Sequence, residues 1–264
     1  MINCFFLFLL FLFFKGDNFL PLRTFLATKE FIDNNKDNIP ILSKANIPQW
    51  FKKLNHSYEK QTVKGCMPFL DTLTTGYILK IPTDYKIRHN VEFEGKKRSG
   101  FDSAQQMINA FTEKVNINYK GRPECHDIQQ LEGSPLVEKN KNLTFHKILN
   151  PWIIKTPPGY STLFVPPLNN ADDRFSIIPG IVDTDSFENE INFPIVINGD
   201  KYEILDTILE RGTPYVQCIP FKRESWKMQI KVIETNKYLE NRFFMVKHLI
   251  HNYKKLFWKK KSWK

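Results

Sequence analysis

The sequence predicts a mainly β protein: a β-sandwich-like core, a short N-terminal helix and an amphipathic, basic helix at the C-terminus. Three observations predict this fold class. Short apolar stretches separated by turn residues succeed one another between residues 156 and 221, which is typical of β-sandwiches and barrels. A proline opens a short amphipathic stretch near residue 50, and apolar residues recur at helical spacing between residues 239 and 257.

The composition indicates a folded protein whose charge is concentrated at one end. Of the 264 residues, 42% are hydrophobic and 14% are aromatic, which excludes a disordered chain. The formal net charge is +10, but seven Lys and no acidic residue lie between Lys247 and Lys264, so the rest carries only +3. The basic character therefore belongs to the C-terminal end and says little about the body.

The cysteines and histidines show no metal-ligand spacing. The four cysteines lie far apart, and none of the six histidines forms a His-x-x-x-His or His-x-Asp pattern. We therefore predict reduced thiols, no metal site and no cofactor. The cysteines are Cys4, Cys66, Cys125 and Cys218.

Residues 1–18 are predicted to lie outside the folded domain. Phe5 to Phe14 is a run of ten apolar residues, too short to span a bilayer, which takes about 20. The run has the length of a signal-peptide core, yet it lacks a basic N-terminal flank and a small-residue cleavage site. Two interpretations stay open: a mis-assigned translation start, or a leader that leaves a membrane or secreted location open.

A single β-rich domain is predicted over residues 19–226. Pro48 suits the first turn of a helix that places Trp50 in the core. Strands are expected at residues 75–82, 91–94 and 143–154, a short helix at Ser103–Phe111, and a polar loop over Lys120–Asn142. Further strands are expected at 161–165, 175–182, 191–197, 202–205 and 215–221.

Turn residues separate these last strands. Pro157-Pro158-Gly159-Tyr160 predicts one turn, and Asn198-Gly199 is the strongest hairpin signal in the chain. A third turn is expected at Arg211-Gly212, before the strand that ends at Phe221.

Residues 227–264 are predicted to form the C-terminal basic helix. Its apolar stripe needs burial somewhere, so we favour packing against the body or against a partner protein. Binding to nucleic acid or to an anionic surface through Lys247–Lys264 is the alternative. The stripe consists of Leu239, Phe243, Val246, Ile250, Tyr253 and Phe257.

Asp183 and Asp185 are the candidate catalytic residues. They follow a Pro-Gly bend within Gly180-Ile181-Val182-Asp183-Thr184-Asp185. Two carboxylates so close together suit acid–base chemistry, and an acidic loop between strands is the other interpretation.

The motifs between Gly76 and Phe221 resemble those of the dUTPase and dCTP deaminase superfamily, which has the β-clip fold. The resemblance rests on Gly76-Tyr77, on the turn at residues 157–160, on Gly180–Asp185, and on Gly212 followed five residues later by Gln217. It implies a β-clip-like core, with Asp183 as the base that activates water. The further ligand-binding residues and the cofactor that it implies are Phe187, Gly212, Gln217 and a magnesium ion.

Parts of that pattern are missing. The phosphate-binding Arg-Ser-Gly would fall on Val165-Pro166-Pro167-Leu168, and a basic stretch replaces the Gly-rich arm that closes over the phosphates. A triphosphate needs several fixed N–H donors and cations. The resemblance is therefore one of fold, which does not carry function by itself.

A second resemblance covers residues 19–226. Four segments resemble a family of domains without an assigned function in marine tailed phages and some bacteria. It implies a location in the host cytoplasm or the virion. The segments are Ile47–Phe51, Thr62–Phe69, Asn150–Tyr160 and Cys218–Trp226.

Three hypotheses follow. The preferred one is a non-catalytic phage accessory or virion-associated protein that binds another protein or itself. The first alternative is a β-clip nucleotide-processing enzyme with Asp183 as base. The second is a nucleic-acid or membrane-surface binder that uses the C-terminal helix.

Overall fold

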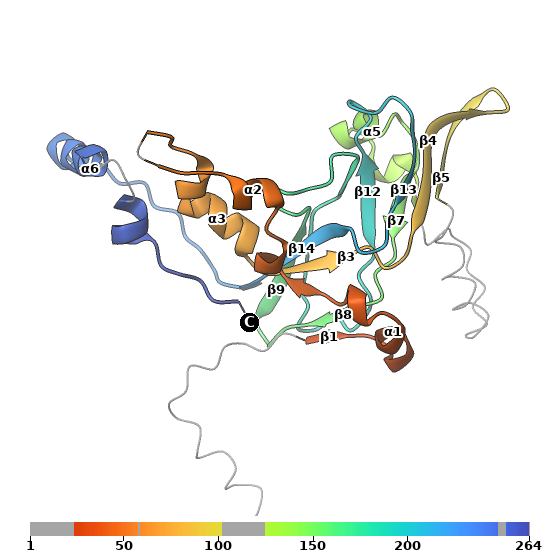
Figure 1. Ribbon diagram of the computed structural model, residues 1–264, viewed down its shortest axis with the longest axis horizontal. Coiled ribbons are helices and arrows are strands. Elements are labelled where there is room, and N and C mark those ends of the chain that lie inside the picture. Colours follow the sequence, from red (N-terminus) through yellow and green to blue (C-terminus); the bar gives the residue numbers. More distant parts are fainter. Residues whose placement is uncertain (1–23, 58, 102–124, 248–251, 264) are drawn as a thin grey trace, which may run out of the picture.

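The computed structural model describes residues 24–57, 59–101, 125–247 and 252–263 (Figure 1). The expected leader over residues 1–18 and the expected helix Ser103–Phe111 lie outside the described residues.

The described part of the chain is mainly β, as predicted. Its 14 strands form four antiparallel sheets, with the strand orders β11-β9-β14-β3-β2, β10-β12-β7-β6, β13-β4-β5 and β1-β8. The strands are β1 (Thr24–Leu26), β2 (Ile41–Leu42), β3 (Tyr77–Lys80), β4 (Tyr85–Phe93), β5 (Lys96–Phe101), β6 (Cys125–His126), β7 (Phe145–Ile148), β8 (Ile153–Lys155), β9 (Tyr160–Val165), β10 (Phe175–Ile177), β11 (Gly180–Val182), β12 (Phe193–Ile197), β13 (Leu205–Leu209) and β14 (Pro214–Lys222).

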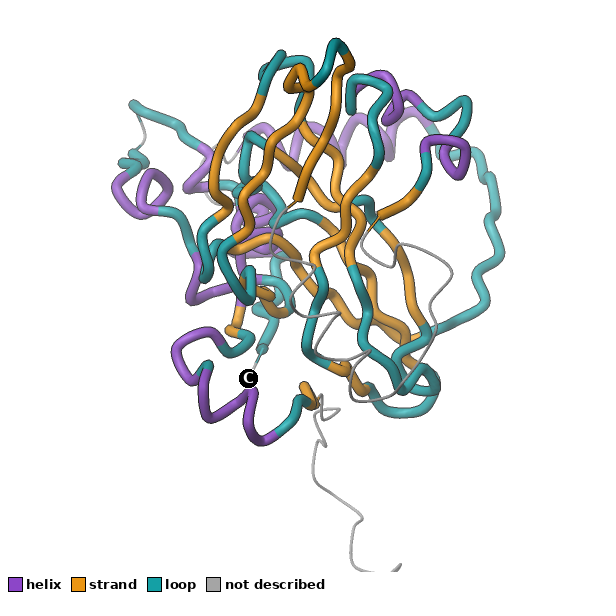
Figure 2. The backbone as a smooth tube through the Cα atoms, turned by 90° about the vertical axis from the view of Figure 1, so that its right-hand side faces the viewer, coloured by secondary structure: helices purple, strands orange, loops and turns teal. Residues whose placement is uncertain are grey.

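The helices are short and lie around the strands (Figure 2). The predicted helix near Pro48 is present as α2, but the aromatic that it buries is Phe51. Trp50 is 48% exposed and packs edge-on against Phe51 and Phe69, so its expected place in the core was wrong. The α-helices are α1 (Lys29–Asn34), α2 (Gln49–Lys53), α3 (Met67–Thr74), α5 (Pro135–Lys139) and α6 (Thr235–Lys247).

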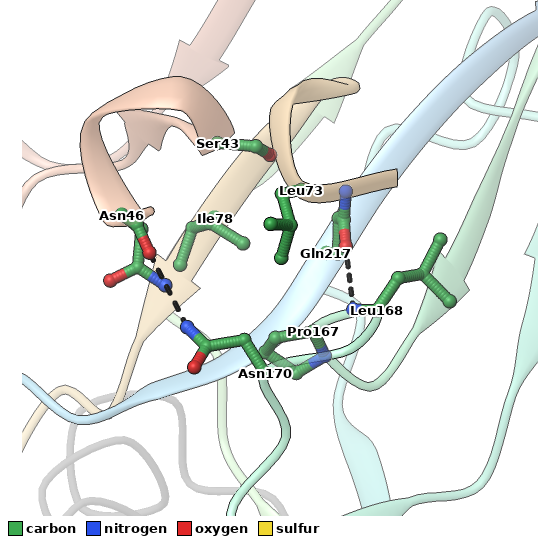
Figure 3. A pocket seen from close by; sticks show the side chains of 8 residues that line it. All are labelled: Ser43, Asn46, Leu73, Ile78, Pro167, Leu168, Asn170 and Gln217. Atoms are coloured by element: carbon green, nitrogen blue, oxygen red, sulfur yellow. Dashed lines mark hydrogen bonds between the residues drawn. The ribbon is translucent and has the colours of Figure 1, made fainter. Parts of the chain in front are cut away.

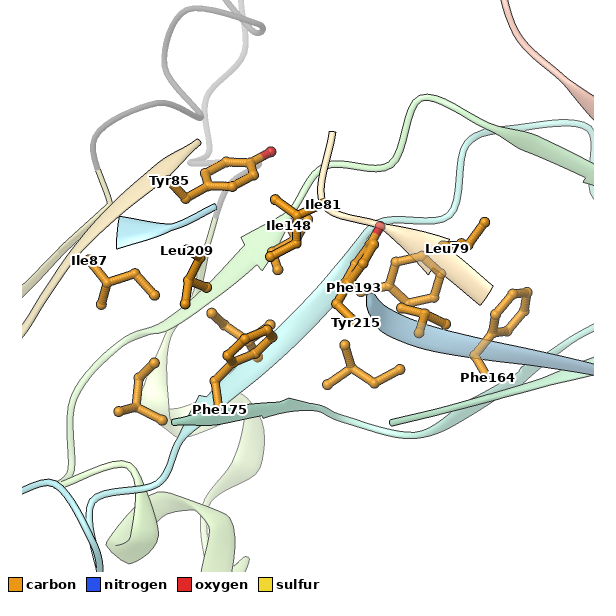
Figure 4. Packing of buried hydrophobic residues seen from close by; sticks show 14 of the residues in the cluster. Leu79, Ile81, Tyr85, Ile87, Ile148, Phe164, Phe175, Phe193, Leu209 and Tyr215 are labelled. Carbon is orange, nitrogen blue, oxygen red and sulfur yellow. The ribbon is translucent and has the colours of Figure 1, made fainter. Parts of the chain in front are cut away.

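All four sheets share one hydrophobic core (Figure 4). Alternate residues of β12 point into it, because successive side chains of a strand face opposite ways. Phe193 lies between the rings of Phe164 and Tyr215, at centroid distances of 5.3 and 5.7 Å. The core thereby joins β9 and β14 of one sheet to β12 of another.

β14 is the central strand of the five-stranded sheet. It pairs with β3 on one side and with β9 on the other over most of its nine residues. Gly76, just before β3, has a φ of +72°, and a Cβ there would lie 2.0 Å from the carbonyl oxygen of Cys218. The close approach of β14 therefore requires a glycine at position 76.

The Asn198-Gly199 turn does not form the predicted hairpin. β12 pairs with β10 and β7, whereas β13 pairs with β4 in another sheet. The N–H of Gly199 donates to the carbonyl of Lys139 at the end of α5. A contact with a distant helix therefore takes the place of the local strand pair.

Two further expectations differ from the structure. The region Lys120–Asn142, expected as loop, contains β6, a 3-10 turn and α5. The helix expected over residues 227–264 is shorter: residues 226–234 are extended, α6 covers Thr235–Lys247, and a π-helical turn covers Tyr253–Phe257. Within the described ranges, no helix has the length and apolar character needed to cross a bilayer.

Replacement of Gly76 by Ala is expected to destabilise the fold by about 2–5 kcal/mol. The reason is the left-handed backbone, about 1–2 kcal/mol, together with overpacking against β14, about 1–3 kcal/mol. Chemical denaturation measures the change. Gly95 is the matched control, because its φ is +71° but nothing lies within 4 Å of its Cβ position. Equal losses for Gly76→Ala and Gly95→Ala would contradict this account.

Candidate functional site

The two candidate carboxylates lie where β11 ends, at the edge of the five-stranded sheet. β9 pairs with both β11 and β14, so the C-terminal ends of those two strands meet near the start of β9. Asp183 and Asp185 follow β11, and Arg223 follows β14 directly. The fold thus brings both carboxylates against one guanidinium group.

Asp185 forms a bidentate ion pair with Arg223. Nη1 of Arg223 donates to Oδ1 of Asp185 at 3.0 Å, and Nη2 donates to Oδ2. The backbone N–H of Gly159 donates to the same Oδ2 at 2.8 Å. The Asp185 side chain is only 10% exposed. Bidentate pairs with a charged acceptor are the stronger class of hydrogen bond, so this carboxylate is held in place.

The turn at residues 157–160 supplies the third donor to Asp185. The N–H of Tyr160 donates to the carbonyl of Pro157 at 3.2 Å, which confirms the predicted turn. Gly159 has a φ of +83°, as the third position of a type II turn requires. Only glycine adopts this backbone readily, and here it also supplies the N–H that binds Asp185.

Asp183 is more exposed and binds the same guanidinium more weakly. Its side chain is 62% exposed, and its Oδ1 lies 3.2 Å from Nη1 of Arg223. Ser161 Oγ donates to the same oxygen at 2.6 Å. We call this set of residues the Arg223 clamp: Gly159, Ser161, Asp183, Asp185 and Arg223.

Thr184, between the two aspartates, faces the protein interior. Its hydroxyl lies 2.8 Å from that of Thr156 and 2.9 Å from that of Thr162, and all three are buried. The chain turns here, because the N–H of Ser186 donates to the carbonyl of Asp183 at 3.1 Å. This turn places the hydroxyl of Thr184 inside and both carboxylates against Arg223.

The electrostatics of Asp185 favour an ion pair over proton transfer. The guanidinium of Arg223 and then the N–H of Gly159 lower the pKa of Asp185 from its ordinary value to about 2. A general base works best when its pKa lies near the working pH. Asp185 is therefore suited to hold Arg223 in place.

Arg223 is also fixed through its backbone. Its N–H donates to the carbonyl of Gly159 at 2.8 Å, and Nη1 donates to the carbonyl of Tyr160 at 3.1 Å. The chain is thus held at residue 223 by its main chain and its side chain together. The clamp marks the point where the sheet ends.

Gln217 lies apart from the carboxylates. It pairs with Val165 at the far end of β9, whereas the clamp residue Ser161 lies near the start of that strand. Four residues of strand separate the two positions, which is about 13 Å. The structure therefore brings Asp183 and Asp185 together but does not bring Gln217 to them.

The side-chain amide of Gln217 is bonded to main-chain groups of three residues, and Figure 3 shows the bond with Leu168. Its oxygen accepts from the N–H of Leu168 at 2.8 Å, and its nitrogen donates to the carbonyls of Thr72 and Thr75 at 2.9 and 2.6 Å. The side chain is buried. Gln217 thus ties β14 to the end of α3 and to the turn after β9.

The pocket beside Gln217 is small. Its cavity volume is about 10 Å³, close to the minimum for one water molecule, whereas ligand pockets typically measure about 300–1,000 Å³. As it stands, the pocket does not accommodate a nucleotide. It is lined by Ser43, Asn46, Leu73, Ile78, Pro167, Leu168, Asn170 and Gln217.

Phe187 and Gly212 have local structural roles. The N–H of Phe187 donates to the carbonyl of Asp183 at 2.9 Å, and its ring is 40% exposed. Gly212 has a φ of +88° in the turn before β14, and its N–H donates to the carbonyl of Ile81 at 2.9 Å. Each residue thus stabilises a turn of the sheet framework.

The chain beyond the clamp is an exposed extended segment. Trp226, Met228, Ile230 and Val232 alternate with polar residues, and their exposures lie between 83% and 101%. No hydrogen bond between backbone groups of the described residues involves residues 224–233. Residues 226–257, of which 226–247 and 252–257 are described, are named the C-terminal arm.

α6 continues the arm away from the sheets (Figure 1). The described members of the predicted apolar stripe, in α6 and in the π-helical turn, are exposed and are not packed into the body; the side chains of Val246 and Ile250 lie outside the description. The large apolar side chains exposed in these two elements are Tyr238, Leu239, Phe243, Phe244, Tyr253, Leu256 and Phe257.

The last described residues return to the body. Nε1 of Trp258 lies 3.0 Å from Oδ2 of Asp71 in α3, and Nζ of Lys261 lies 2.5 Å from the same oxygen. The ring of Trp263 meets that of Tyr77 edge-on at 6.1 Å. The arm is therefore attached at both ends, by the Arg223 clamp and by Asp71.

Nearly all of the net charge lies in this part of the chain. From residue 226 to the end there are eleven Lys and Arg against two Glu, so the segment carries nine of the ten net positive charges. The rest of the chain is close to neutral. The C-terminal end of the chain therefore combines exposed apolar side chains with nearly all of the net positive charge.

A second polar cluster lies between β4, β5 and β7. Ser99 Oγ lies 2.9 Å from Nδ1 of His89 and 2.9 Å from Nε2 of His146. Burial lowers the pKa of His89 to about 4, so this imidazole is neutral at physiological pH. Within the described residues, no group of three or more His, Cys, Asp or Glu could hold a metal ion.

Sequence reasoning missed Arg223, Asp71 and the extended segment over residues 226–232. One signal was available: Trp-Lys-Met-Gln-Ile-Lys-Val over residues 226–232 alternates strictly, which predicts a strand and not a helix. The partners of Arg223 and Asp71 lie far away in the chain and left no local signal.

No protein-family model matches this chain, and a search of curated proteins finds no matching relative.

Replacement of Gln217 by Leu is expected to reduce the free energy of unfolding by about 2–4 kcal/mol. The change leaves one buried N–H and two buried carbonyl groups without a hydrogen-bond partner. Each such group costs about 1–3 kcal/mol when it is fully unsatisfied. Asn170→Ala is the control, because Asn170 lines the same pocket with one 3.3 Å bond to the carbonyl of Asn46. A Leu variant of unchanged stability would show that Gln217 is not a structural link.

Acid is expected to remove the contribution of Asp185 to stability. Because its pKa is lowered in the folded state, this contribution is complete above about pH 4 and is lost as the pH falls to about 2. The melting temperatures of the native chain and Asp185→Asn should therefore differ at neutral pH and converge in acid.

Asp206→Asn serves as the control for this titration. Asp206 is exposed and lies 3.8 Å from Lys86, so its loss should have little effect at any pH. A difference for Asp185→Asn that persisted at the acid end would show that its ion pair does not cause the destabilisation.

Proposed function

We propose that this protein is a non-catalytic binding protein that attaches to another protein through its C-terminal arm. The observation that supports it most directly is the exposed apolar surface of the arm, which begins at Trp226 and continues through α6. Contiguous apolar surface of this kind marks interaction sites on soluble proteins. The proposal requires no metal or cofactor.

The attachment of the arm at both ends supports the same function. Arg223 and Asp71 hold its two ends on the body. A segment whose ends are fixed loses less conformational freedom on binding than a free tail does. The arm is therefore prearranged for a partner, while the sheets below it act as a support.

The geometry of the carboxylates supports a structural role for them. Asp185 is engaged by Arg223 and Gly159, and Gln217 lies about 13 Å along β9 from the clamp. The nucleotide-enzyme alternative, with Asp183 as base and magnesium as cofactor, would need a different arrangement of these groups around a bound phosphate.

The resemblance to a domain family of tailed phages suggests where the partner would be found. A virion-associated or accessory role in the host cytoplasm fits a neutral body that carries one basic, apolar arm. Aromatic and basic residues interleave near the end of the chain, so nucleic acid and anionic membranes are the competing targets.

The test compares two variants of the full chain. One replaces Trp226, Met228, Ile230 and Val232 by Ser; the other replaces Lys254, Lys255, Lys259 and Lys260 by Gln. Co-purification with phage particles, or stoichiometric complexes in sedimentation experiments, should be lost in the Ser variant and retained in the Gln variant.

The opposite pattern would overturn the proposal. Loss in the Gln variant, with binding to DNA or to anionic vesicles that falls steeply with salt, would assign the arm to a charged surface. A thermal shift with dUTP or dCTP and magnesium would favour the enzyme alternative.

A further inference from the structure

We propose that residues 226–232 form an additional β-strand on the outer edge of β11 in a second copy of this chain, with the exchange being reciprocal. This inference rests on the proposed function, because it names the partner of the arm. It requires a donor strand, a matching edge, and a reason why the strand does not pair within its own chain.

The donor is a strand without a sheet. Trp226, Met228, Ile230 and Val232 fall on one face of the extended chain, and Lys227, Gln229 and Lys231 fall on the other. No backbone hydrogen bond joins this segment to the described residues. Isolated strands are not stable in water, and adding a strand to an open sheet edge satisfies both the backbone and the apolar face.

The acceptor is the edge strand of the five-stranded sheet. Among the strand pairings of the described residues, β11 pairs with β9 and with no other strand. Ile181, at the middle of β11, is 62% exposed, and nothing lies within 4 Å of the Cβ position of Gly180. An unpaired edge of this kind is a template for strand addition.

Charge favours this edge over that of β5. The run from Asp183 to Glu190 directly after β11 contains four acidic residues and no basic one. Arg223 and Lys155 offset part of this charge, but Asp183 stays 62% exposed, and a strand added at β11 would bring Lys227 and Lys231 near this run. β5, another edge strand, carries Lys96, Lys97 and Arg98 and would repel the arm. β13 is less open, because Arg174 donates to the carbonyl of Ile208.

Reach excludes pairing of the whole segment within the same chain. An arm strand outside β11 would lie three strand spacings from β14, about 14 Å, because β9 and β11 lie between. The chain from the clamp at Arg223 to Trp226 spans at most about 11 Å when fully extended. A strand that begins its pairing at Trp226 therefore has to come from another molecule.

Reciprocal exchange gives a closed two-fold dimer. Each copy donates residues 226–232 and accepts the same segment at β11, so both copies use one self-complementary surface. Every strand pair in the described sheets is antiparallel, and we expect the added strand to be antiparallel as well.

The test uses a proline at a residue that points away from the apolar face. Gln229→Pro removes a backbone donor and breaks strand pairing without changing the apolar side chains. Gln229→Ala is the matched control. Sedimentation of the full chain should show a dimer for the native chain and for Gln229→Ala, with affinity at least about tenfold lower for Gln229→Pro.

Mixing variants tests whether the exchange runs between molecules. Ile181→Lys places a charge on the exposed edge and should weaken the dimer. A mixture of Gln229→Pro and Ile181→Lys retains one native edge and one native arm, so it should form a mixed dimer that neither variant forms alone. Hydrogen exchange at residues 226–232 should slow with protein concentration in the native chain and not in Gln229→Pro.

The outcomes separate the two proposals. If the native chain is monomeric but the arm still binds phage particles or another purified protein, the exchange is wrong and the proposed function stands. If Gln229→Pro dimerises like the native chain, the arm does not pair as a strand. If the chain is monomeric and binds no partner, both proposals fail.

Discussion

The ion pair between Arg223 and Asp185 decides where the folded body stops. It forms only because β9 lies between β11 and β14, so that residues 38 positions apart meet at one corner of the sheet. The turn at Gly159 closes the same corner through two backbone contacts, one to Arg223 and one to Asp185. The described strands all lie N-terminal of Arg223, and the apolar side chains of residues 226–232 directly beyond it are exposed.

The sequence predicted the class of fold well, because local patterns carry that information. Alternating apolar residues and turn residues marked β9, β12 and β14, and Pro158-Gly159 marked a real turn. Pairing was harder to predict. Asn198-Gly199 had the local chemistry of a hairpin, yet Gly199 contacts Lys139, because long-range packing decides which strands pair.

At the candidate site, too, local patterns were predictive and long-range contacts were not. The sequence located Asp183 and Asp185, but their partner Arg223 was hidden by its distance along the chain. The helical spacing after Leu239 favours a helix at the C-terminal end, whereas the alternation that begins at Trp226 predicts a strand. Two periodicities adjoin there, and the helix predicted over residues 227–264 follows from the longer one. The boundary between them, at about residue 234, separates the extended half of the arm from its helical half.

The contacts of Trp258 and Lys261 with Asp71 make the arm a closed loop. The entropy of closing a loop grows only with the logarithm of its length. Insertions or deletions between Val232 and Trp258 would therefore cost the body almost nothing, because Asp71 and Tyr77 both hold the returning end of the chain. The fold thus tolerates changes in the length of this segment, whereas Arg223, Asp185 and Asp71 set where the loop begins and ends.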